Sequence, residues 1–445
     1  MSEESLMDDV LDSEQDVLAD LSGADTALSR RTFLQTLGAG LLITVTQGNA
    51  RGQGRSRGGG QSKTVVARLY LNMDGSITVL TGKVEEGQGA RAELSQAAAE
   101  ELGVPAQRVC LIMADTDLVP DDGMTAGSRT TPRNVPAVRR AGAFARELLK
   151  RVAAQVWQVD ANSLKVDKGI ITHAKTKKTM TYADLARSQD VVEAFNQSIP
   201  GDVSVTAVHD WDVMGQSVPR PNLRDLVTGA HHYPSDVRLP NMLYGKVLRA
   251  PSYGASLESI DLAPARAMQD VVVLREGQFV GCAAPSTYRA TQALEAVART
   301  AVWKTVDQVS SQDVFAHLKQ HARTGGRSRA SRRGSIDKGL ADAHKRLKQT
   351  YEVAYVQHTP MEPRAATVQW KDGKLTAWAG VDYPQRIQGD LARTFKLPRE
   401  RVRVIVPDMG GGFGGKHTGE AAEEAARLAR AAKRPVAVGW TRGEE

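Results

Sequence analysis

A loop with five glycines in six residues, Gly410 to Gly415, most constrains what this 445-residue chain can fold into. A β-rich run at 402–406 precedes the loop, and an Ala-rich stretch at 419–433 that predicts a helix follows it. Glycines let a backbone approach a ligand closely, and the N-terminus of a following helix offers free N–H groups to an anion. The order of strand, glycine loop and helix therefore predicts a ligand-binding loop in a fold that mixes strands and helices.

The loop matches two nucleotide-binding patterns incompletely. It contains the dinucleotide spacing G-x-G-x-x-G, but a run so rich in glycine satisfies many patterns. No Asp or Glu ends a following strand, because the residues at 435–439 are Pro-Val-Ala-Val-Gly. It also resembles a P-loop up to Lys416, but His417 stands where a Ser or Thr hydroxyl should bind Mg²⁺. Both interpretations are therefore weak.

The composition excludes several classes of protein. With 41% hydrophobic and 24% charged residues the chain is typical of globular proteins, and no apolar run approaches the roughly 18 residues that a membrane span needs. Cys110 and Cys282 lie far apart and outside any Cys-x-x-Cys. The chain alone therefore cannot form a disulfide scaffold, hold an iron–sulfur cluster through cysteines or attach haem covalently.

Charge is distributed unevenly along the chain. The first 28 residues contain nine acidic residues and no Lys or Arg, although the net charge of the whole chain is +7. The basic remainder suits polyanions, from phosphate cofactors to nucleic acid or a membrane surface, and it equally suits a solvated basic face.

Residues 1–50 are predicted to be an acidic extension followed by an export signal. Arg30-Arg31 precedes Phe33-Leu34 and an uncharged stretch at 36–50 that ends in small residues. This order resembles a twin-arginine signal, which exports folded proteins; an ordinary helix start with two surface arginines is the alternative. Residues 51–63, rich in Gly and Arg, are expected to be a linker. No aromatic residue stands among them to stack on bases, so we expect no nucleic-acid partner.

The body of the chain predicts an α+β, multidomain fold. Asp74-Gly75 separates two alternating runs and predicts a hairpin, and apolar periodicity predicts helices at 91–102 and 138–156. Short strands and a helix at 288–299 predict a modest α+β unit at 220–305. The expected units are 64–215, 220–305 and 337–445, with a basic segment at 306–336 that favours a linker over a polyanion patch.

Several separate motifs resemble the large subunit of the xanthine dehydrogenase/aldehyde oxidase family. Met409 to Lys416 looks like that family's molybdopterin loop, and Glu86-Gly-Gln-Gly89 with Thr125-Ala-Gly-Ser128 resembles its second cofactor-binding stretch. Further matching segments are 226–236, 242–251 and His358-Thr-Pro-Met-Glu-Pro363. The resemblance implies a small hammerhead-like α/β domain at 220–305, flanked by portions of molybdopterin-binding domains at 64–215 and 337–445.

The order of the motifs resembles one branch of the family. The Gly-Gln-Gly stretch precedes the hammerhead-like block, and an export signal precedes both, as in the branch of the isoquinoline 1-oxidoreductase β-subunits. This resemblance implies a periplasmic molybdenum-dependent oxidoreductase, with membrane association as a further option, that oxidises N-heterocycles or aldehydes. It also implies a molybdopterin cytosine dinucleotide cofactor, a small ferredoxin-like subunit with [2Fe–2S] clusters, and a c-type cytochrome as electron acceptor.

The resemblance also implies roles for individual residues. The backbone of Gly411, Gly412, Phe413 and Gly414 would lie over the molybdenum, and the pterin and its phosphates would be held by Gly87, Gln88, Gly89, Ala126, Gly127 and Ser128. Taken alone, Gly87 to Gly89 could equally be a plain loop before a helix. His417 replaces a substrate-facing glutamate of the xanthine-oxidising relatives, so purine specificity is not expected. We expect no metal ligand, because His358 and Glu362 flank Pro360, which disfavours one helix face for both.

The catalytic base of the family is missing from this sequence. Relatives use a glutamate in a Gly-x-Gly-Glu context far beyond the glycine loop, whereas Glu444 and Glu445 lie too close to the loop. We therefore expect a fragment, a second polypeptide that supplies the rest, or an inactive product. The alternatives from other classes are a cofactor-binding or assembly protein without catalysis, and a basic polyanion-binding module using 51–63 and 321–347.

Overall fold

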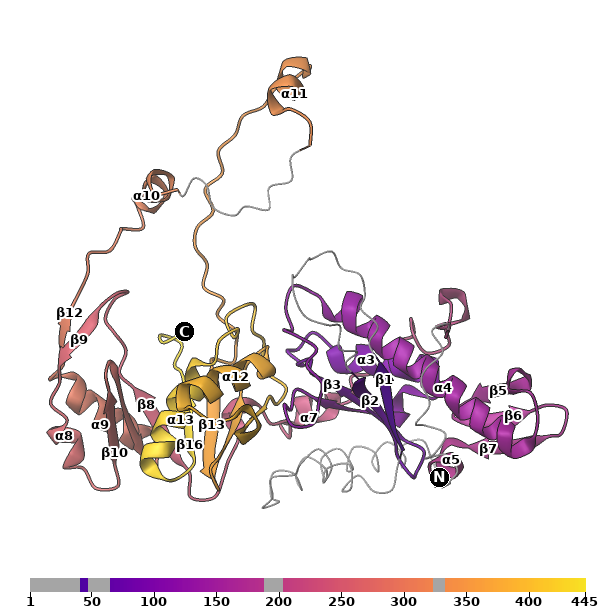
Figure 1. Cartoon of the computed structure of the whole chain (residues 1–445). Coiled ribbons are helices and arrows are strands. Elements are labelled where there is room, and N and C mark those ends of the chain that lie inside the picture. Colours follow the sequence, from indigo (N-terminus) through magenta and orange to yellow (C-terminus); the bar gives the residue numbers. More distant parts are fainter. Residues whose placement is uncertain (1–40, 47–64, 188–202, 323–332) are drawn as a thin grey trace.

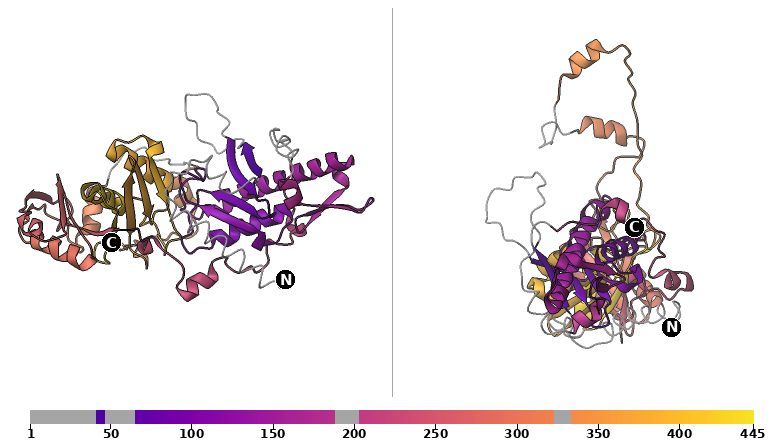
Figure 2. Two further views of the ribbon diagram at one scale, coloured as in Figure 1. Left: turned by 90° about the horizontal axis from the view of Figure 1, so that it is seen from below. Right: turned by 90° about the vertical axis from the view of Figure 1, so that its right-hand side faces the viewer.

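The computed structural model describes residues 41–46, 65–187, 203–322 and 333–445, which form two lobes side by side and a projecting arm (Figures 1 and 2). The predicted arginine pair, the cleavage point near Ala50 and the 51–63 linker lie outside the described residues. Among the described helices, none is both long and apolar enough to span a bilayer.

The first lobe contains a four-stranded sheet of order β1-β2-β3-β4. Its strands are β1 (Leu41–Thr46), β2 (Val65–Leu71), β3 (Ile77–Thr81) and β4 (Val109–Met113), antiparallel except for the β3–β4 pair. The predicted hairpin is confirmed: Gly75, at φ +85°, turns β2 into β3. Strand β1 lies inside the stretch predicted as the apolar part of an export signal, and the signal itself stays a prediction.

Two helices cover this sheet, close to where the sequence predicts them. Helix α3 (Ala90–Leu102) ends at Gly103, which adopts a left-handed conformation that glycine tolerates. Helix α4 (Val135–Trp157) starts with Pro136 in its first turn, after a π-helical turn at Thr130–Asn134. Beyond α4 lie β5 (Leu164–Asp167), β6 (Ile170–His173), β7 (Lys178–Thr181) and α5 (Tyr182–Ala186).

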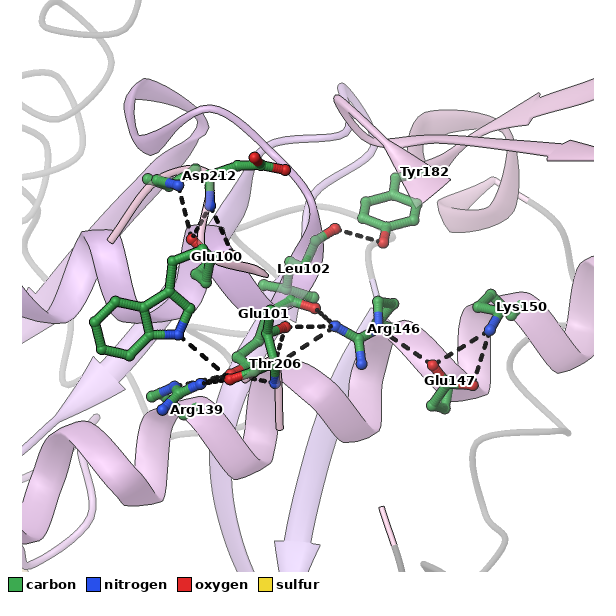
Figure 3. Close-up of polar contacts among 12 residues, drawn as sticks. Glu100, Glu101, Leu102, Arg139, Arg146, Glu147, Lys150, Tyr182, Thr206 and Asp212 are labelled. Atoms are coloured by element: carbon green, nitrogen blue, oxygen red, sulfur yellow. Dashed lines mark hydrogen bonds and ion pairs between the residues drawn. The ribbon is translucent and has the colours of Figure 1, made fainter. Parts of the chain in front are cut away.

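A buried polar network fixes α3 to α4 and to the chain at 206–214 (Figure 3). Glu101, whose side chain is fully buried, accepts hydrogen bonds from Arg139 Nε at 2.8 Å and from the backbone and hydroxyl of Thr206 at 3.0 Å. Glu100 accepts from three successive backbone N–H groups, those of Asp212, Val213 and Met214. The buried carboxylates of Glu100 and Glu101 are therefore both hydrogen-bonded, as a buried charge requires.

The second lobe contains a seven-stranded sheet of order β10-β11-β8-β16-β13-β14-β15. Its strands are β8 (Leu243–Val247), β10 (Val272–Glu276), β11 (Phe279–Ala284), β13 (Ala365–Lys371), β14 (Lys374–Ala379), β15 (Val402–Ile405) and β16 (Val436–Gly439). Strand β16 pairs in parallel with β8, with Val436 opposite Leu243. The 220–305 block and the C-terminal block therefore share one sheet in this structure.

Helices pack on this sheet. They are α8 (Ala263–Arg266), α9 (Thr287–Ala298), α12 (Pro384–Phe395) and α13 (Glu420–Ala432). A further short helix, α7 (Leu223–Thr228), belongs to the chain that leads from the first lobe to β8. Gly245 and Gly281 let α13 approach closely, because a Cβ on either would lie 2.6 Å or 3.1 Å from a methyl carbon of Leu428. Strands β9 (Ser256–Ser259) and β12 (Val302–Lys304) form a separate two-stranded sheet. Short 3₁₀ turns occur at Ala106–Arg108, Ala161–Ser163, Val208–Asp210, Pro234–Asp236 and Arg399–Arg401.

An arm projects from the second lobe between β12 and β13 (Figures 1 and 2). It contains α10 (Val314–Gln320) and α11 (Ile336–Asp342). Helix α10 lies within the 306–336 segment that the sequence predicts as a linker.

The two lobes meet through β15 and the loop after β4. Arg403 on β15 binds Asp115 with its Nε 3.0 Å from Oδ1, and Lys374 on β14 binds Asp117 at 2.7 Å. The backbone N–H of Thr116 donates to Val404 at 3.0 Å. These contacts place the start of the glycine loop, which follows β15, directly against the first lobe.

Candidate functional site: three loops that meet between the lobes

The glycine loop lies against the segment that precedes α3. The backbone N–H of Met409 donates to the carbonyl of Glu85 at 2.9 Å, and Gly415 N–H closes a turn on Gly412 O at 2.7 Å. Gly411 and Gly414 have φ of +86° and +98°, and Phe413 itself adopts +52°. The side chain of Phe413 is 73% exposed, which is unusual for so large an apolar group. The loop therefore presents the aromatic ring of Phe413 to solvent, while Gly411, Gly412 and Gly415 are buried.

Lys416 supports the loop from inside. Its side chain is fully buried, and Nζ donates to Glu362 Oε2 at 2.9 Å. The same oxygen accepts from the backbone N–H of Gly410 at 2.9 Å. Because this lysine is already bound to a carboxylate, it is not placed as a P-loop lysine would be to meet a phosphate. Glu362 therefore positions the loop by binding both Lys416 and the backbone of Gly410.

The other glycines of the loop are needed for close packing. A Cβ on Gly410 would lie 2.8 Å from Glu362 Cβ, and one on Gly415 would lie 3.2 Å from both Gly412 O and His358 Cβ. A Cβ on Gly414 would lie 3.2 Å from His358 Nε2. By contrast, a Cβ on Gly412 would make only ordinary contacts, of 3.5 Å or more. Gly412, although buried, is thus the glycine of this loop at which an added methyl group would fit without a clash.

His417 is held by Asp382. The Nδ1 atom of the imidazole is hydrogen-bonded to Asp382 Oδ2, and the two side chains are 38% and 2% exposed. Burial raises the pKa of the Asp382 carboxyl, against the opposing effect of the His417 hydrogen bond. The second oxygen, Oδ1, is buried and has no partner among the described residues. The imidazole is therefore fixed through one nitrogen, with Nε2 as the nitrogen remaining for proton exchange.

Asp382 also joins the glycine loop to the 125–128 loop. Its backbone N–H donates to Lys416 O at 3.2 Å, and its carbonyl accepts from Thr125 N–H at 2.9 Å. The hydroxyl of Thr125 in turn accepts from the backbone of Val84 at 3.0 Å. Gly127 and Ser128, both at positive φ, are exposed at the tip of this loop, and Ala126 is half-buried beside them.

The Gly-Gln-Gly turn is organised by a carboxylate of its own. Glu85 accepts from the backbone N–H groups of Gly87 at 2.9 Å, Gly89 at 3.0 Å and Arg91 at 2.9 Å, so it occupies the N-terminus of α3. Gln88 is bound to the backbone of Val84 at 2.9 Å. These N–H groups therefore do not reach outward to a phosphate in this structure, which departs from the expectation for this turn. Its outer face is nevertheless open, since no atom lies within 4 Å of a Cβ on Gly87 or Gly89.

Glu86 lies in the site, although the sequence motifs assign it no role. Its Oε2 lies 3.6 Å from the position of a Cβ on Gly412, and its Oε1 is buried without a partner among the described residues. Burial, and next the negative charge of Asp382, raise its pKa to about 8, while Lys416 acts in the opposite direction. The residues around Glu86 come from three separate segments of the chain. The only sequence signal for a role of Glu86 is therefore its position beside the Gly-Gln-Gly motif.

The structure thus brings all of the predicted site segments together. Loops 85–89, 125–128 and 410–417 converge where the two lobes meet, and His358 lies beside Gly414. The described residues contain no group of three or more His, Cys, Asp or Glu side chains that could hold a metal ion. The site is therefore assembled from glycine turns and single polar side chains that lie far apart in the sequence.

Comparison with protein families gives two matches of one kind. A profile described as "Molybdopterin cofactor-binding domain" matches residues 19–231, and a second profile of the same description matches residues 319–445. Together they include all three converging loops.

Named relatives are longer than this chain. One subunit of the nicotinate dehydrogenase of Pseudomonas putida is 30% identical over 391 residues, which cover 85% of this chain and 32% of that protein. The beta subunit of isoquinoline 1-oxidoreductase of Brevundimonas diminuta is 29% identical, covering 94% of this chain and 60% of that protein. The molybdenum-binding subunit PaoC of an aldehyde oxidoreductase of Escherichia coli (strain K12) is 42% identical over 106 residues, 24% of this chain and 14% of that protein. The chain thus spans between about a third and three fifths of the length of the first two relatives.

Solved structures with partial similarity carry related names. Quinoline 2-oxidoreductase from Pseudomonas putida 86 matches 52% of this chain and 35% of its own, at a TM-score of 0.45 and 26% identity. Aldehyde oxidoreductase from Desulfovibrio gigas matches 81% of this chain and 48% of its own, at a TM-score of 0.43 and 16% identity.

Proposed function

Because the chain belongs to the molybdopterin-binding subunits of the xanthine dehydrogenase family, we propose that it forms the cofactor-holding part of a molybdenum hydroxylase. The proposed reaction oxidises an aromatic N-heterocycle or an aldehyde, with water as the oxygen source. The names of the relatives support this substrate class, since nicotinate and isoquinoline are N-heterocycles and PaoC belongs to an aldehyde oxidoreductase. The single observation that carries the proposal is the convergence of the three loops, which are joined by the backbone hydrogen bonds of Asp382 to Thr125 and Lys416 and of Met409 to Glu85.

The site fits molybdopterin, which we propose is present as its cytosine dinucleotide. A pterin presents amino and ring N–H donors, and the site offers buried carboxyl oxygens without partners on Glu86, Glu362 and Asp382 among the described residues. The open faces of Gly87 and Gly89 and the exposed Phe413 leave backbone and an aromatic ring for a flat group to lie against. Arg129, whose Nε lies 3.6 Å from a Cβ position on Gly127, is a cation for a phosphate at the exposed 125–128 loop.

When bound, the cofactor would supply the oxygen-transfer and electron-accepting chemistry of its molybdenum. The residues of this chain would hold the cofactor in position and would bind or release protons. Lys416 with Glu362 holds the glycine loop in shape. Glu86, with its raised pKa, stays protonated near neutral pH and can donate a hydrogen bond where an ionised glutamate could only accept one. Asp382 orients His417 for proton exchange through Nε2.

Electrons are proposed to leave through a small [2Fe–2S] subunit toward a c-type cytochrome, after twin-arginine export to the periplasm. Support comes from the two cysteines, which are far apart, with Cys282 buried and unable to ligate a cluster alone. The chain spans 32% and 60% of two relatives, so the reaction is assigned to the assembled enzyme and not to these 445 residues alone.

The test is retention of cofactor in a matched pair of glycine variants. Gly412→Ala introduces a Cβ at ordinary contact distance from its neighbours and 3.6 Å from Glu86 Oε2, beside one of the carboxyl groups proposed to meet the pterin. Gly389→Ala, on α12 with no atom within 4 Å of its Cβ, is the control. We expect Gly412→Ala to fold normally and to lose most of its pterin and molybdenum, while the control keeps both. Equal cofactor content in the two variants would contradict the proposed site and leave an assembly or non-catalytic role.

A further inference from the structure

The part of the arm that leads into β13 carries a largely exposed apolar pattern with a period of two. Leu347, Tyr351, Val353 and Tyr355 fall on odd positions, so an extended chain directs them to one side. Their exposed fractions are 98%, 83%, 79% and 77%. Gln349 interrupts this row, and Val356, which is 82% exposed, falls on the opposite side. Aromatic and β-branched residues with a period of two are the signature of a strand whose one face is buried.

This segment has the sequence of a strand without a strand partner. Residues 346–358 form neither helix nor strand, and no backbone–backbone hydrogen bond joins them to other described residues. Single exposed apolar residues are ordinary on a protein surface, but a contiguous row of large ones marks an interaction site. An unpaired edge with such a row is also a ready template for another chain.

The C-terminal residue of the chain lies at the foot of this segment. The side-chain amide of Gln357 donates to the carbonyl of Glu445, and the Arg364 guanidinium lies 3.4 Å from the Glu445 carboxylate. Two relatives are matched over only 60% and 32% of their own length. A polypeptide with the relatives' remaining length would therefore have the arm within reach, whether joined to Glu445 or separate from it.

We propose that residues 347–357 form a β-strand that pairs with a polypeptide supplying the part of the relatives' length that this chain does not span. The row of Leu347, Tyr351, Val353 and Tyr355 would pack into the apolar face of that polypeptide, and the arm's free backbone groups would join its sheet. The inference rests on the proposed function in that such a polypeptide completes the enzyme.

The experiment co-expresses the full chain with the unmatched portion of the Brevundimonas diminuta isoquinoline 1-oxidoreductase subunit, tagged for purification. Hydrogen exchange at 347–357 is measured in the copurified complex and in the chain alone. A triple variant, Tyr351→Ser/Val353→Ser/Tyr355→Ser, removes the apolar row. The matched control, Thr350→Ser/Glu352→Gln/Ala354→Ser, changes the opposite face of the same segment.

We expect copurification with exchange at 347–357 slowed by at least about tenfold, kept by the control and lost in the triple variant. Failure of the two polypeptides to copurify, or a complex that forms equally well with the triple variant, would overturn the proposal. So would a dimer of the chain alone that the triple variant abolishes, because it assigns the arm to a second copy. Pterin content of the same preparations separates the two claims: cofactor without arm protection overturns only this inference, and arm protection without cofactor overturns only the proposed function.

Discussion

Asp382 and His417 form a hydrogen-bonded pair in which the carboxylate is buried and the imidazole is partly exposed beside the glycine loop. The carboxylate accepts the Nδ1 proton and so selects the tautomer of the ring. The two residues are 35 positions apart, and the backbone of Asp382 ties the same point to both Lys416 and Thr125. The pair therefore sits where the three loops of the site meet.

Asp382→Asn should allow His417 to adopt both of its neutral tautomers. An amide can accept from Nδ1–H through its oxygen or donate to an unprotonated Nδ1 through its nitrogen, so Nδ1 is no longer held as a donor alone. We expect a change in the ¹⁵N shifts of the ring toward a mixed tautomer, and a loss of stability on the order of 1–3 kcal/mol because the site is buried. Asp390→Asn, an exposed change on α12, is the control. Unchanged ring shifts in Asp382→Asn would refute the pairing.

Glu86→Gln should stabilise the protein at alkaline pH. The folded-state pKa, about 8, lies above the ordinary value of 4.5, so between these values the folded protein keeps a proton that the unfolded chain releases. The contribution of Glu86 to stability is therefore full below pH 4.5 and is lost as the pH rises to 8. We expect the glutamine variant to match the parent near pH 4.5 and to exceed it above pH 8, by on the order of 1–3 kcal/mol.

Urea denaturation at several pH values measures this difference. Glu295→Gln, at an exposed position on α9, is the control and should show no such growth with pH. A difference for Glu86→Gln that stays constant or shrinks with rising pH would show that this carboxyl is not held protonated by its surroundings.

Lys416→Met should destabilise the folded chain because it leaves the Glu362 carboxylate without its ion-pair partner. Lys416 is fully buried and its Glu362 partner is 10% exposed, so removal of one charge strands the other. The expected loss is about 3–5 kcal/mol. The double variant Lys416→Met/Glu362→Gln should recover part of it, since no unpaired charge then remains. Denaturation curves of four proteins (the parent, the two single variants Lys416→Met and Glu362→Gln, and the double variant) give the coupling, and strictly additive effects would contradict an ion pair here.

Arg403→Met should loosen the two lobes from each other. Arg403 and Asp115 are both nearly buried and bind across the lobe boundary. Loss of the arginine should cost about 3 kcal/mol and expose the loop at 115–125 to protease. Arg401→Met, on the same stretch but exposed, is the control. Equal protease resistance in the two variants would show that the contact does not hold the lobes together.

Local signals in the sequence predict the local elements well. Helices α3 and α4 start and end close to the predicted residues because Gly103 and the apolar stripes are local features. The shared sheet could not be predicted, because the parallel pairing of Val436 with Leu243 joins strands that are far apart in the sequence. The role of Glu86 was missed for a related reason, since its burial depends on Gly412, Asp382 and Lys416 from distant segments.

The molybdenum and pterin content of the full chain tests its proposed cofactor-holding role most directly. The protein is expressed with its neighbouring genes in a host that makes the cofactor, and it is purified by a tag on this chain. We expect close to one molybdenum and one pterin per chain, with cytosine released on hydrolysis. The absence of both molybdenum and pterin, in preparations where a known relative is fully loaded, would contradict the cofactor-holding role.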